Sequence, residues 1–493
     1  MNSPTTITRR NFLQLAALAP LATLHAVDVK PAERPNIVFI ITDQQKPSAM
    51  SCTGNPDVNT PNMDRLAARG VRFTKSYATF PLCCPSRASL FTSRMPHEMG
   101  IFENGPSAEL SQKGLPTMGE LFQAAGYRTA YAGKWHASMP LPAVSRKPED
   151  RKIIGFETLP IPGDVDKKYP KHQPPPDVTP GLYSDQNIAE AAAQFIAQPH
   201  AKPFLLVVSI FNPHDICYVS RPDNAQKLKH LLPEDRSKLP PLPPNHKDTD
   251  ALPTSIEHFA KGRSKWTEQE WREHLWIYYR LTERSDVAIG RVLAALDKAG
   301  LTDCTLRVFT ADHGDMNSAH GLVSKGFLYE NSGGVPLIVS PPGGQAKVDK
   351  EHLVSGLDVM PTLLDYAGIP APASLLGRSL KPVVEGQPVA WREFVPAEAS
   401  GHWSPDSRMI RTARYKYVVF ASGANREQFF DMEEDPGELK NLIYEPALAA
   451  EIQRHRDLLK QWMLQTKDDA FGKDHDLPGK NKSSGTDKRA NEE

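Results

Sequence analysis

Two pairs of possible metal ligands each follow a run of apolar residues. Asp43 and Gln44 come after NIVFIIT, and Asp312 and His313 come after LRVFTA. Such runs are typical of buried parallel strands, and ligands bind beyond the carboxyl ends of these strands. Either pair alone could simply cap a turn, but together they predict one site. Their oxygen donors favour a hard divalent cation, Ca²⁺ first, with Mg²⁺ and Mn²⁺ as alternatives.

Basic residues stand near the same predicted strand ends and loop turns. Lysine and arginine are usually solvated, but these residues lie beside buried segments, where that interpretation is weaker. A metal ion surrounded by basic groups suits a sulfate or phosphate ester, because these groups hold its oxygens while a proton donor serves the leaving alkoxide. The basic candidates are Arg87, Lys134, His136, His214 and Lys325.

Two adjacent cysteines, Cys83 and Cys84, stand just before Pro85 and Arg87. Five cysteines do not make a disulfide framework for 493 residues, and neighbouring cysteines bridge each other only with strain. The chain has no CxxC spacing, which argues against structural zinc. A thiol nucleophile and a chemically modified cysteine remain open at this point.

The stretch CCPSRASLFTSR resembles the signature of the type I, formylglycine-dependent sulfatases of the alkaline phosphatase superfamily. Cys83 fills its first position and Cys84 its variable one. The stretches GKWH, NPHD, ADHGD and GLVSKGFLYENSGGVPLIV resemble further blocks of that family, in the family order. The resemblance implies that a separate formylglycine-generating enzyme oxidises Cys83, and not Cys84, to Cα-formylglycine. One hydroxyl of the hydrated aldehyde then attacks sulfur, and the other later expels sulfate.

The resemblance also implies which residues hold the metal. Many sulfatases carry Asp-Asp and Asp-Asn at the two ligand pairs, whereas this chain carries Gln44 and His313 as the second members. That departure puts the metal identity in question and leaves a phosphorus ester open as substrate. The implied ligands are Asp43, Gln44, Cys83, Asp312 and His313.

Each basic candidate receives a role by the same resemblance. Arg87 would steady the formylglycine, and Lys134 would bridge it to the sulfate. His136 would act as base for the elimination. His214 and Lys325 would contact the bridging oxygen, and His214 is favoured as the acid because a histidine pKa is easily placed near neutrality.

Strand and helix patterns alternate along most of the chain, which predicts an α/β fold. We expect a large, mostly parallel sheet sandwiched by helices in a catalytic domain over residues 34–375. A smaller C-terminal α+β subdomain with a short antiparallel sheet is expected over 376–466. Residues 467–493 are polar and read as a disordered tail.

The amino-terminal residues have the pattern of an export signal. Arg9 and Arg10 precede a short apolar run, which resembles a twin-arginine signal peptide over residues 1–26. The run is too short to span a bilayer, so no stable membrane anchor is expected. The sequence therefore predicts a periplasmic or secreted protein.

These features together predict a sulfuric ester hydrolase that acts on a sulfated carbohydrate or another organosulfate. Lys+Arg and Asp+Glu balance at 58 each, so no overall field favours nucleic acid. A phosphonate monoester or phosphodiester hydrolase of the same superfamily is one alternative, and an inactive sulfated-glycan-binding protein is another. His402 and Trp403, with the proline-rich loops, are candidates for contacts to a sugar.

Overall fold

The computed structural model describes residues 34–104, 115–137, 153–162, 180–219, 228–247, 252–261, 266–402 and 404–471. The predicted signal peptide, Trp403 and most of the predicted tail lie outside the described residues. Within them, no helix is both long and apolar enough to cross a membrane.

A mixed sheet forms the centre of the described chain, with eight strands in the order β5-β4-β6-β1-β7-β8-β2-β9. Its middle strands β4, β6, β1 and β7 are mutually parallel, and β8 runs antiparallel to β7. The predicted large, mostly parallel sheet is therefore confirmed. The strand bounds are β1 (Asn36–Asp43), β2 (Val71–Phe73), β4 (Arg128–Gly133), β5 (Glu157–Thr158), β6 (Phe204–Pro213), β7 (Thr305–Ala311), β8 (Leu337–Ser340) and β9 (Lys347–Asp349).

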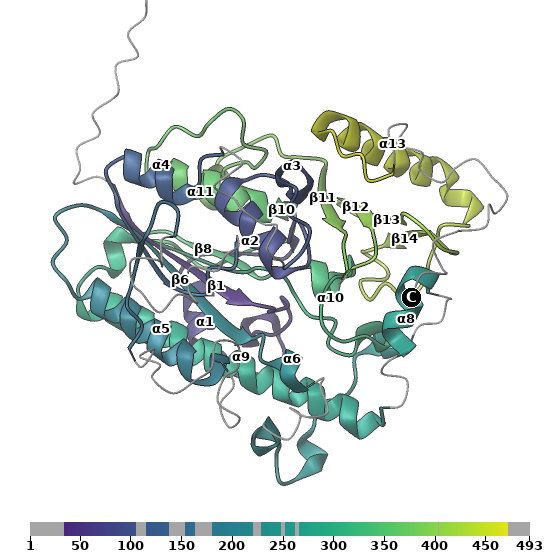
Figure 1. The fold of residues 1–493 in the computed structure, drawn as a ribbon, viewed down its shortest axis with the longest axis horizontal. Coiled ribbons are helices and arrows are strands. Elements are labelled where there is room, and N and C mark those ends of the chain that lie inside the picture. Colours follow the sequence, from purple (N-terminus) through teal and green to yellow (C-terminus); the bar gives the residue numbers. More distant parts are fainter. Residues whose placement is uncertain are drawn as a thin grey trace, which may run out of the picture.

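Helices cover both faces of this sheet, as Figure 1 shows. Side chains of a strand alternate between faces, so Phe39 of β1 joins one hydrophobic cluster and Ile40 the other. The first cluster includes α2 (Cys83–Thr92), α4 (Met118–Ala124) and α11 (Val359–Tyr366). The second includes α1 (Pro61–Ala67), α5 (Pro180–Ile196) and α9 (Glu268–Lys298). Burial on both faces explains why the strands are continuously apolar.

The other elements around the main sheet are short. Strands β3 (Ser76–Tyr77) and β10 (Val354–Ser355) pair with each other in parallel. The remaining short helices are α3 (Pro96–Met99), α6 (Ile216–Val219), α8 (Thr254–Lys261), α10 (Glu330–Gly333) and α12 (Lys381–Val384).

A second, antiparallel sheet follows in the C-terminal part, as predicted. Its strands are β11 (Phe394–Ala399), β12 (Ser407–Thr412), β13 (Tyr415–Phe420) and β14 (Glu427–Asp431). One face packs on α13 (Ala449–Thr466), at the upper right of Figure 1. The other face packs on side chains of residues 77–82 and 316–329. These segments lead directly into Cys83 and surround Lys325, so the second sheet supports the predicted site.

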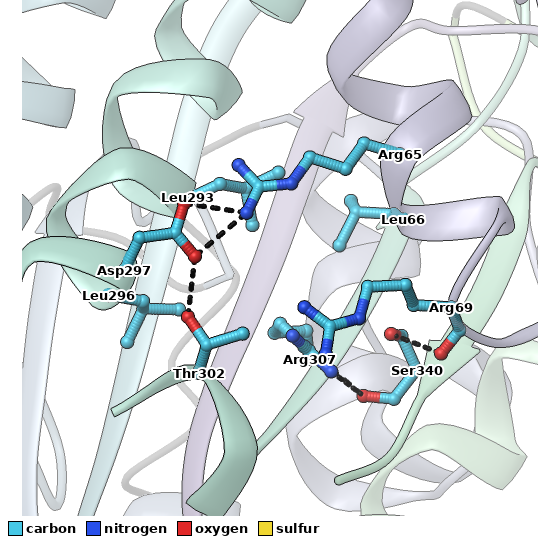
Figure 2. Close-up of a pocket in the computed structure, with 9 residues that line it drawn as sticks. All are labelled: Arg65, Leu66, Arg69, Leu293, Leu296, Asp297, Thr302, Arg307 and Ser340. Atoms are coloured by element: carbon cyan, nitrogen blue, oxygen red, sulfur yellow. Dashed lines mark hydrogen bonds and ion pairs between the residues drawn. The ribbon is translucent and has the colours of Figure 1, made fainter. Parts of the chain in front are cut away.

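Charged residues at the amino-terminal edge of the main sheet serve packing. Figure 2 shows Arg65 of α1 pointing at Asp297 of α9, with an N–O distance of 2.6 Å. Arg69 pairs with Asp303 at 2.9 Å, and Arg307 donates to the backbone oxygen of Ser340 at 3.4 Å. The cavity between them measures about 10 Å³, which is room for one water molecule. These contacts tie α1 and α9 to the sheet, whereas the predicted ligands lie at its opposite edge.

His97 of α3 connects the large domain to the C-terminal sheet. Its Nδ1 lies 2.6 Å from Glu398 of β11, and its Nε2 lies 3.2 Å from the backbone oxygen of Thr466. Both ring nitrogens face acceptors, so the imidazolium satisfies both contacts. Burial opposes this charge, but hydrogen bonding and charge from Glu398, together with Asp468, raise the pKa of His97.

We predict that this contact stabilises the protein at acidic pH. Because the folded-state pKa of His97 is raised, its contribution is full below about pH 6.5 and is lost as pH rises through the folded-state value. The exchange His97→Gln should lower the free energy of unfolding by about 1.5–3 kcal/mol at pH 5.5 and by less at pH 9. Urea unfolding at both pH values measures this difference, with exposed His402→Gln as control. An equal loss at both pH values would contradict it.

Candidate active site

The helix α2 presents Cys83 and Arg87 to the carboxyl edge of the main sheet. The helix begins at Cys83, with Pro85 in its first turn. Pro85 fits because the first turn of a helix does not need its backbone N–H. Cys83 and Arg87 are four residues apart and therefore share a helix face. Every residue of α2 is buried.

Arg87 connects four strands of the main sheet, at or just after the ends of β1, β4 and β7 and inside β6. Its Nε donates to Asp312 at 2.7 Å, and its Nη2 donates to Asp43 at 3.0 Å. Its Nη1 donates to the Lys134 carbonyl at 2.9 Å and to the Ser209 hydroxyl at 2.7 Å. The guanidinium and both carboxylates are fully buried. A buried cation is tolerated only when it is paired in this way.

Polar side chains surround the Cys83 sulfur. Lys325 Nζ and His313 Nε2 each lie 3.2 Å from it, and Asp43 Oδ1 lies at 3.7 Å. His136 and His214 also lie close enough to interact with the Cys83 thiol. Burial opposes ionisation of this thiol, but Lys134, Lys325 and His313 outweigh it and lower the pKa of Cys83 well below its usual range. The surroundings therefore stabilise a negative charge at this position.

Four of the five predicted metal ligands converge on one point, and the fifth, Gln44, has its Oε1 2.6 Å from Lys325 Nζ, which lies 3.2 Å from the Cys83 sulfur. One ligand atom from each of Asp43, Cys83, Asp312 and His313 lies within 4.8 Å of all the others. His313 Nδ1 faces the backbone oxygen of Gly314 at 2.8 Å, so Nδ1 keeps its proton, and a cation that displaces the proton of Nε2 would meet the Nε2 lone pair in the cluster. Two carboxylates and an imidazole nitrogen fit a divalent cation. A possible metal site, but not the identity of its ion, follows from this geometry.

The charges around the cluster shift several pKa values. Burial and the charge of Asp43 raise the pKa of Asp312 to about 6. Burial and the neighbouring Cys83 act in the same direction on Asp43, but Lys134, His214 and Arg87 hold the pKa of Asp43 well below its usual range. Burial, Lys325 and Lys134 lower the pKa of His214 to about 4. His214 is therefore neutral at pH 7 when no anion is bound.

The loops that carry the site contain several non-glycine residues with positive φ. Gln44 has φ of 68°, directly after β1, and His136 has φ of 43° after β4. Ser318 at 78° and Ser324 at 69° belong to the loop that leads to Lys325. This left-handed region is unfavourable for residues with a Cβ, by about 1–2 kcal/mol each. Such strain is typical of functional sites held by the surrounding fold.

The structure brings all of the predicted catalytic and metal-binding residues together at this edge. Three further side chains, which the sequence analysis did not name, contact these residues: Ser209, Cys217 and Asp315. Ser209 lies inside β6 and gave no signal, because a serine in a buried strand is commonplace. Cys217 stands three residues after His214, and Asp315 ends the ADHGD stretch, so proximity to those motifs was the available signal.

Cys84 faces away from the cluster. It packs with Ala88, Met99 and Ile101, and its backbone N–H donates to Asn104 at 2.9 Å. Burial and the neighbouring Cys83 raise the pKa of Cys84 to about 12, so it stays a thiol. All five cysteines are free.

His320, in the loop before Lys325, stacks on Tyr329 with ring centroids 4.1 Å apart.

We predict that removing the Arg87 charge destabilises the metal-free protein. Arg87→Met leaves two buried carboxylates without the guanidinium and should lower the free energy of unfolding by about 3–5 kcal/mol. The control Arg454→Met removes an exposed pair with Glu393 and should cost less than about 1 kcal/mol. Urea unfolding in the presence of EDTA measures both. A loss for Arg87→Met no larger than that of the control would show that the pair contributes nothing.

Comparison with known proteins identifies the family. The family model described as Sulfatase matches residues 35–369. A second, described as the C-terminal part of N-sulphoglucosamine sulphohydrolase, matches residues 318–467.

Individual relatives agree with this. A Δ4,5-hexuronate-2-O-sulfatase of Bacteroides thetaiotaomicron is 30% identical over 89% of this chain and 90% of its own length. An ulvan-active sulfatase of Formosa agariphila is 33% identical over 84% of this chain and 78% of its own length. The solved structure of a 2-O GAG sulfatase matches with a TM-score of 0.76 and 28% identity, over 89% of this chain and 93% of that one. The chain therefore belongs to the sulfatase family of the alkaline phosphatase superfamily, and the prediction of a sulfatase is confirmed.

Proposed function

We propose that this sulfatase hydrolyses sulfate esters of a sulfated carbohydrate, with Cys83 converted to formylglycine as its nucleophile. The observation that carries the proposal is the ring of groups around Cys83, with metal-ligand candidates on one side and cations on the other. The named substrates of the relatives, a hexuronate sulfate and ulvan, support a carbohydrate. In the mature enzyme, a hydroxyl oxygen of hydrated formylglycine takes the place of the Cys83 sulfur.

The cation would be held by Asp43, Gln44, Asp312, His313 and the modified residue 83. Ca²⁺ is our first choice, because most of these donors are oxygens, with Mg²⁺ and Mn²⁺ as alternatives. When bound, the cation polarises a sulfate oxygen and favours the ionised hydroxyl of residue 83.

The chain's own residues then bind and orient the ester. Lys134 and Lys325 supply positive charge beside Cys83, while Arg87 holds the helix that carries it. His214 donates the proton that the leaving alkoxide needs when its S–O bond breaks. The negative charge of a bound sulfate raises the pKa of His214 from its low value toward neutrality, which suits a proton donor. His136, which lies close to residue 83, accepts the proton of the second hydroxyl as sulfate leaves.

Maturation and location complete the proposal. A formylglycine-generating enzyme needs access to Cys83, which is fully buried here, so conversion comes before folding is complete. We propose export by the twin-arginine route to the periplasm or the exterior, on the basis of the Arg9-Arg10 pattern.

We predict that protein made with a formylglycine-generating enzyme shows Cys83 converted to an aldehyde or its hydrate. Mass spectrometry of the Cys83 peptide tests this directly. Cys83→Ala should lower turnover of an aryl sulfate by about four orders of magnitude or more, because the nucleophile is lost. Cys84→Ser is the matched control and should retain turnover within about threefold, since Cys84 packs away from the cluster.

Two results would contradict this. An unmodified Cys83 thiol in active protein would remove the proposed nucleophile. Binding of a sulfated glycan without any turnover by converted protein would instead support the binding-protein alternative.

A phosphonate monoester or phosphodiester hydrolase is the second candidate, because Gln44 and His313 replace the residues common in sulfatases. We predict that kcat/KM for an aryl sulfate exceeds that for the matching aryl phosphonate by about ten- to hundredfold. A phosphonate ester lacks one of the three terminal oxygens, so it loses one charge-assisted contact of about 1.5–3 kcal/mol. A higher kcat/KM for the phosphonate would reverse the assignment.

A further inference from the structure

We propose that Asp315 is a positioning residue that fixes which end of the Gln44 carboxamide faces the cation site. The inference rests on the proposed function, in which Gln44 is a ligand of the cation. It assigns a role to a residue outside that ligand set.

Gln44 makes contacts at both ends of its amide. Its Nε2 donates to Asp315 Oδ2 at 2.5 Å. Its Oε1 accepts from Lys325 Nζ at 2.6 Å and from Cys217 Sγ at 3.3 Å. A carboxylate only accepts hydrogen bonds and an ammonium only donates them. Asp315 and Lys325 therefore specify the same orientation independently.

The reversed amide would be unfavourable at both ends. Its oxygen would face the Asp315 carboxylate at 2.5 Å, and its NH₂ would face the Lys325 ammonium at 2.6 Å. The two ends of a carboxamide have nearly the same shape, so packing alone cannot choose between them. The choice matters because only the oxygen has a lone pair for a cation. An aspartate or glutamate ligand would not need such a device, since both of its ends are oxygens.

Asp315 and the backbone of Gln44 are themselves fixed. Asp315 is fully buried, and its Oδ1 accepts from the backbone N–H of Asn317 at 2.7 Å. The Tyr278 hydroxyl donates to the Gln44 carbonyl at 2.8 Å, and Gln44 N–H donates to Asp312 at 3.0 Å. With the backbone held, the remaining freedom of Gln44 lies in its side-chain torsions. Asp315, which accepts from Nε2, and Lys325, which donates to Oε1, restrict the last of these torsions.

A double-mutant cycle tests this with Asp315→Asn and Gln44→Glu. Glutamate has the same shape as glutamine, but both ends of its carboxylate are oxygens, so reversing the group changes nothing. Asparagine at 315 has one oxygen for two donors, Gln44 Nε2 and Asn317 N–H. We expect Asp315→Asn to weaken Ca²⁺ binding about tenfold or more when residue 44 is Gln, as partners of metal ligands typically do. With Gln44→Glu in place, the same exchange should cost nothing or tighten binding, because it replaces a like-charged neighbour with a donor.

The measurement is isothermal titration calorimetry of Ca²⁺ into matured protein from which metal has been stripped. Asp286→Asn is the matched control, because Asp286 is a buried carboxylate that accepts from the Asn62 carboxamide at 2.8 Å, far from the site in sequence and on α9. It should lower stability without changing Ca²⁺ affinity. If Asp315→Asn unfolds, Asp315→Ser runs through the same cycle.

The outcomes separate the two proposals. A loss below about threefold with Gln44, or an equal loss in both backgrounds, overturns the positioning role while leaving the proposed function intact. If the unaltered protein binds no divalent cation, the cation site in the proposed function fails, and this inference fails with it.

Discussion

The contact on which the site depends is the buried guanidinium of Arg87 between Asp43 and Asp312. These carboxylates end two adjacent parallel strands, and like charges so close together repel unless a cation lies between them. Arg87 supplies that cation one turn after Cys83 on α2, and its Nη1 reaches the end of β4 and the Ser209 hydroxyl inside β6. The same side chain thus fixes the helix on which Cys83 lies. A lysine could not replace it, because one ammonium cannot make this set of planar, divergent hydrogen bonds.

Around this contact, the chain concentrates charge locally while remaining neutral overall. Its 58 basic and 58 acidic residues cancel, yet the buried Lys134 and the half-buried Lys325 both act on the Cys83 thiol. Electrostatic effects are stronger there than in water, because little solvent screens them. The second sheet contributes by packing on residues 77–82 and 316–329, the segments that lead to Cys83 and surround Lys325. Anion selectivity therefore comes from the site and not from the molecular surface as a whole.

The sequence was sufficient for the fold class and for gathering the candidate residues, because both are local patterns. An apolar run followed by Asp43 or Asp312 marks a strand end, and parallel strand ends meet at one edge. The signature also distinguished Cys83 from Cys84, whose side chains have different neighbours: Cys83 contacts Lys325, and Cys84 packs in an apolar cluster. The roles of these residues and the domain boundary near residue 375 stay predictions.

Contacts that depend on strand order could not be predicted in this way. Ser209 meets Arg87 only because β6 lies next to β1, and Asp315 meets Gln44 across 271 residues of sequence. The low pKa of His214 depends on burial and on two lysines that come from other segments. Strand β11 was also missed, since its pattern FVPAEA contains a proline and a glutamate.

The positive φ angles in the site loops bear on how this enzyme could be engineered. Ser318 and Ser324 each adopt a backbone conformation that glycine tolerates better, so a search for thermostable variants would favour glycine there. Those exchanges would also widen the range of conformations open to the loop that carries Lys325. Heat resistance gained at these two positions would therefore make Lys325, which contacts Cys83, less rigidly placed. Stabilising changes are better sought in α13 or at the amino-terminal edge of the main sheet.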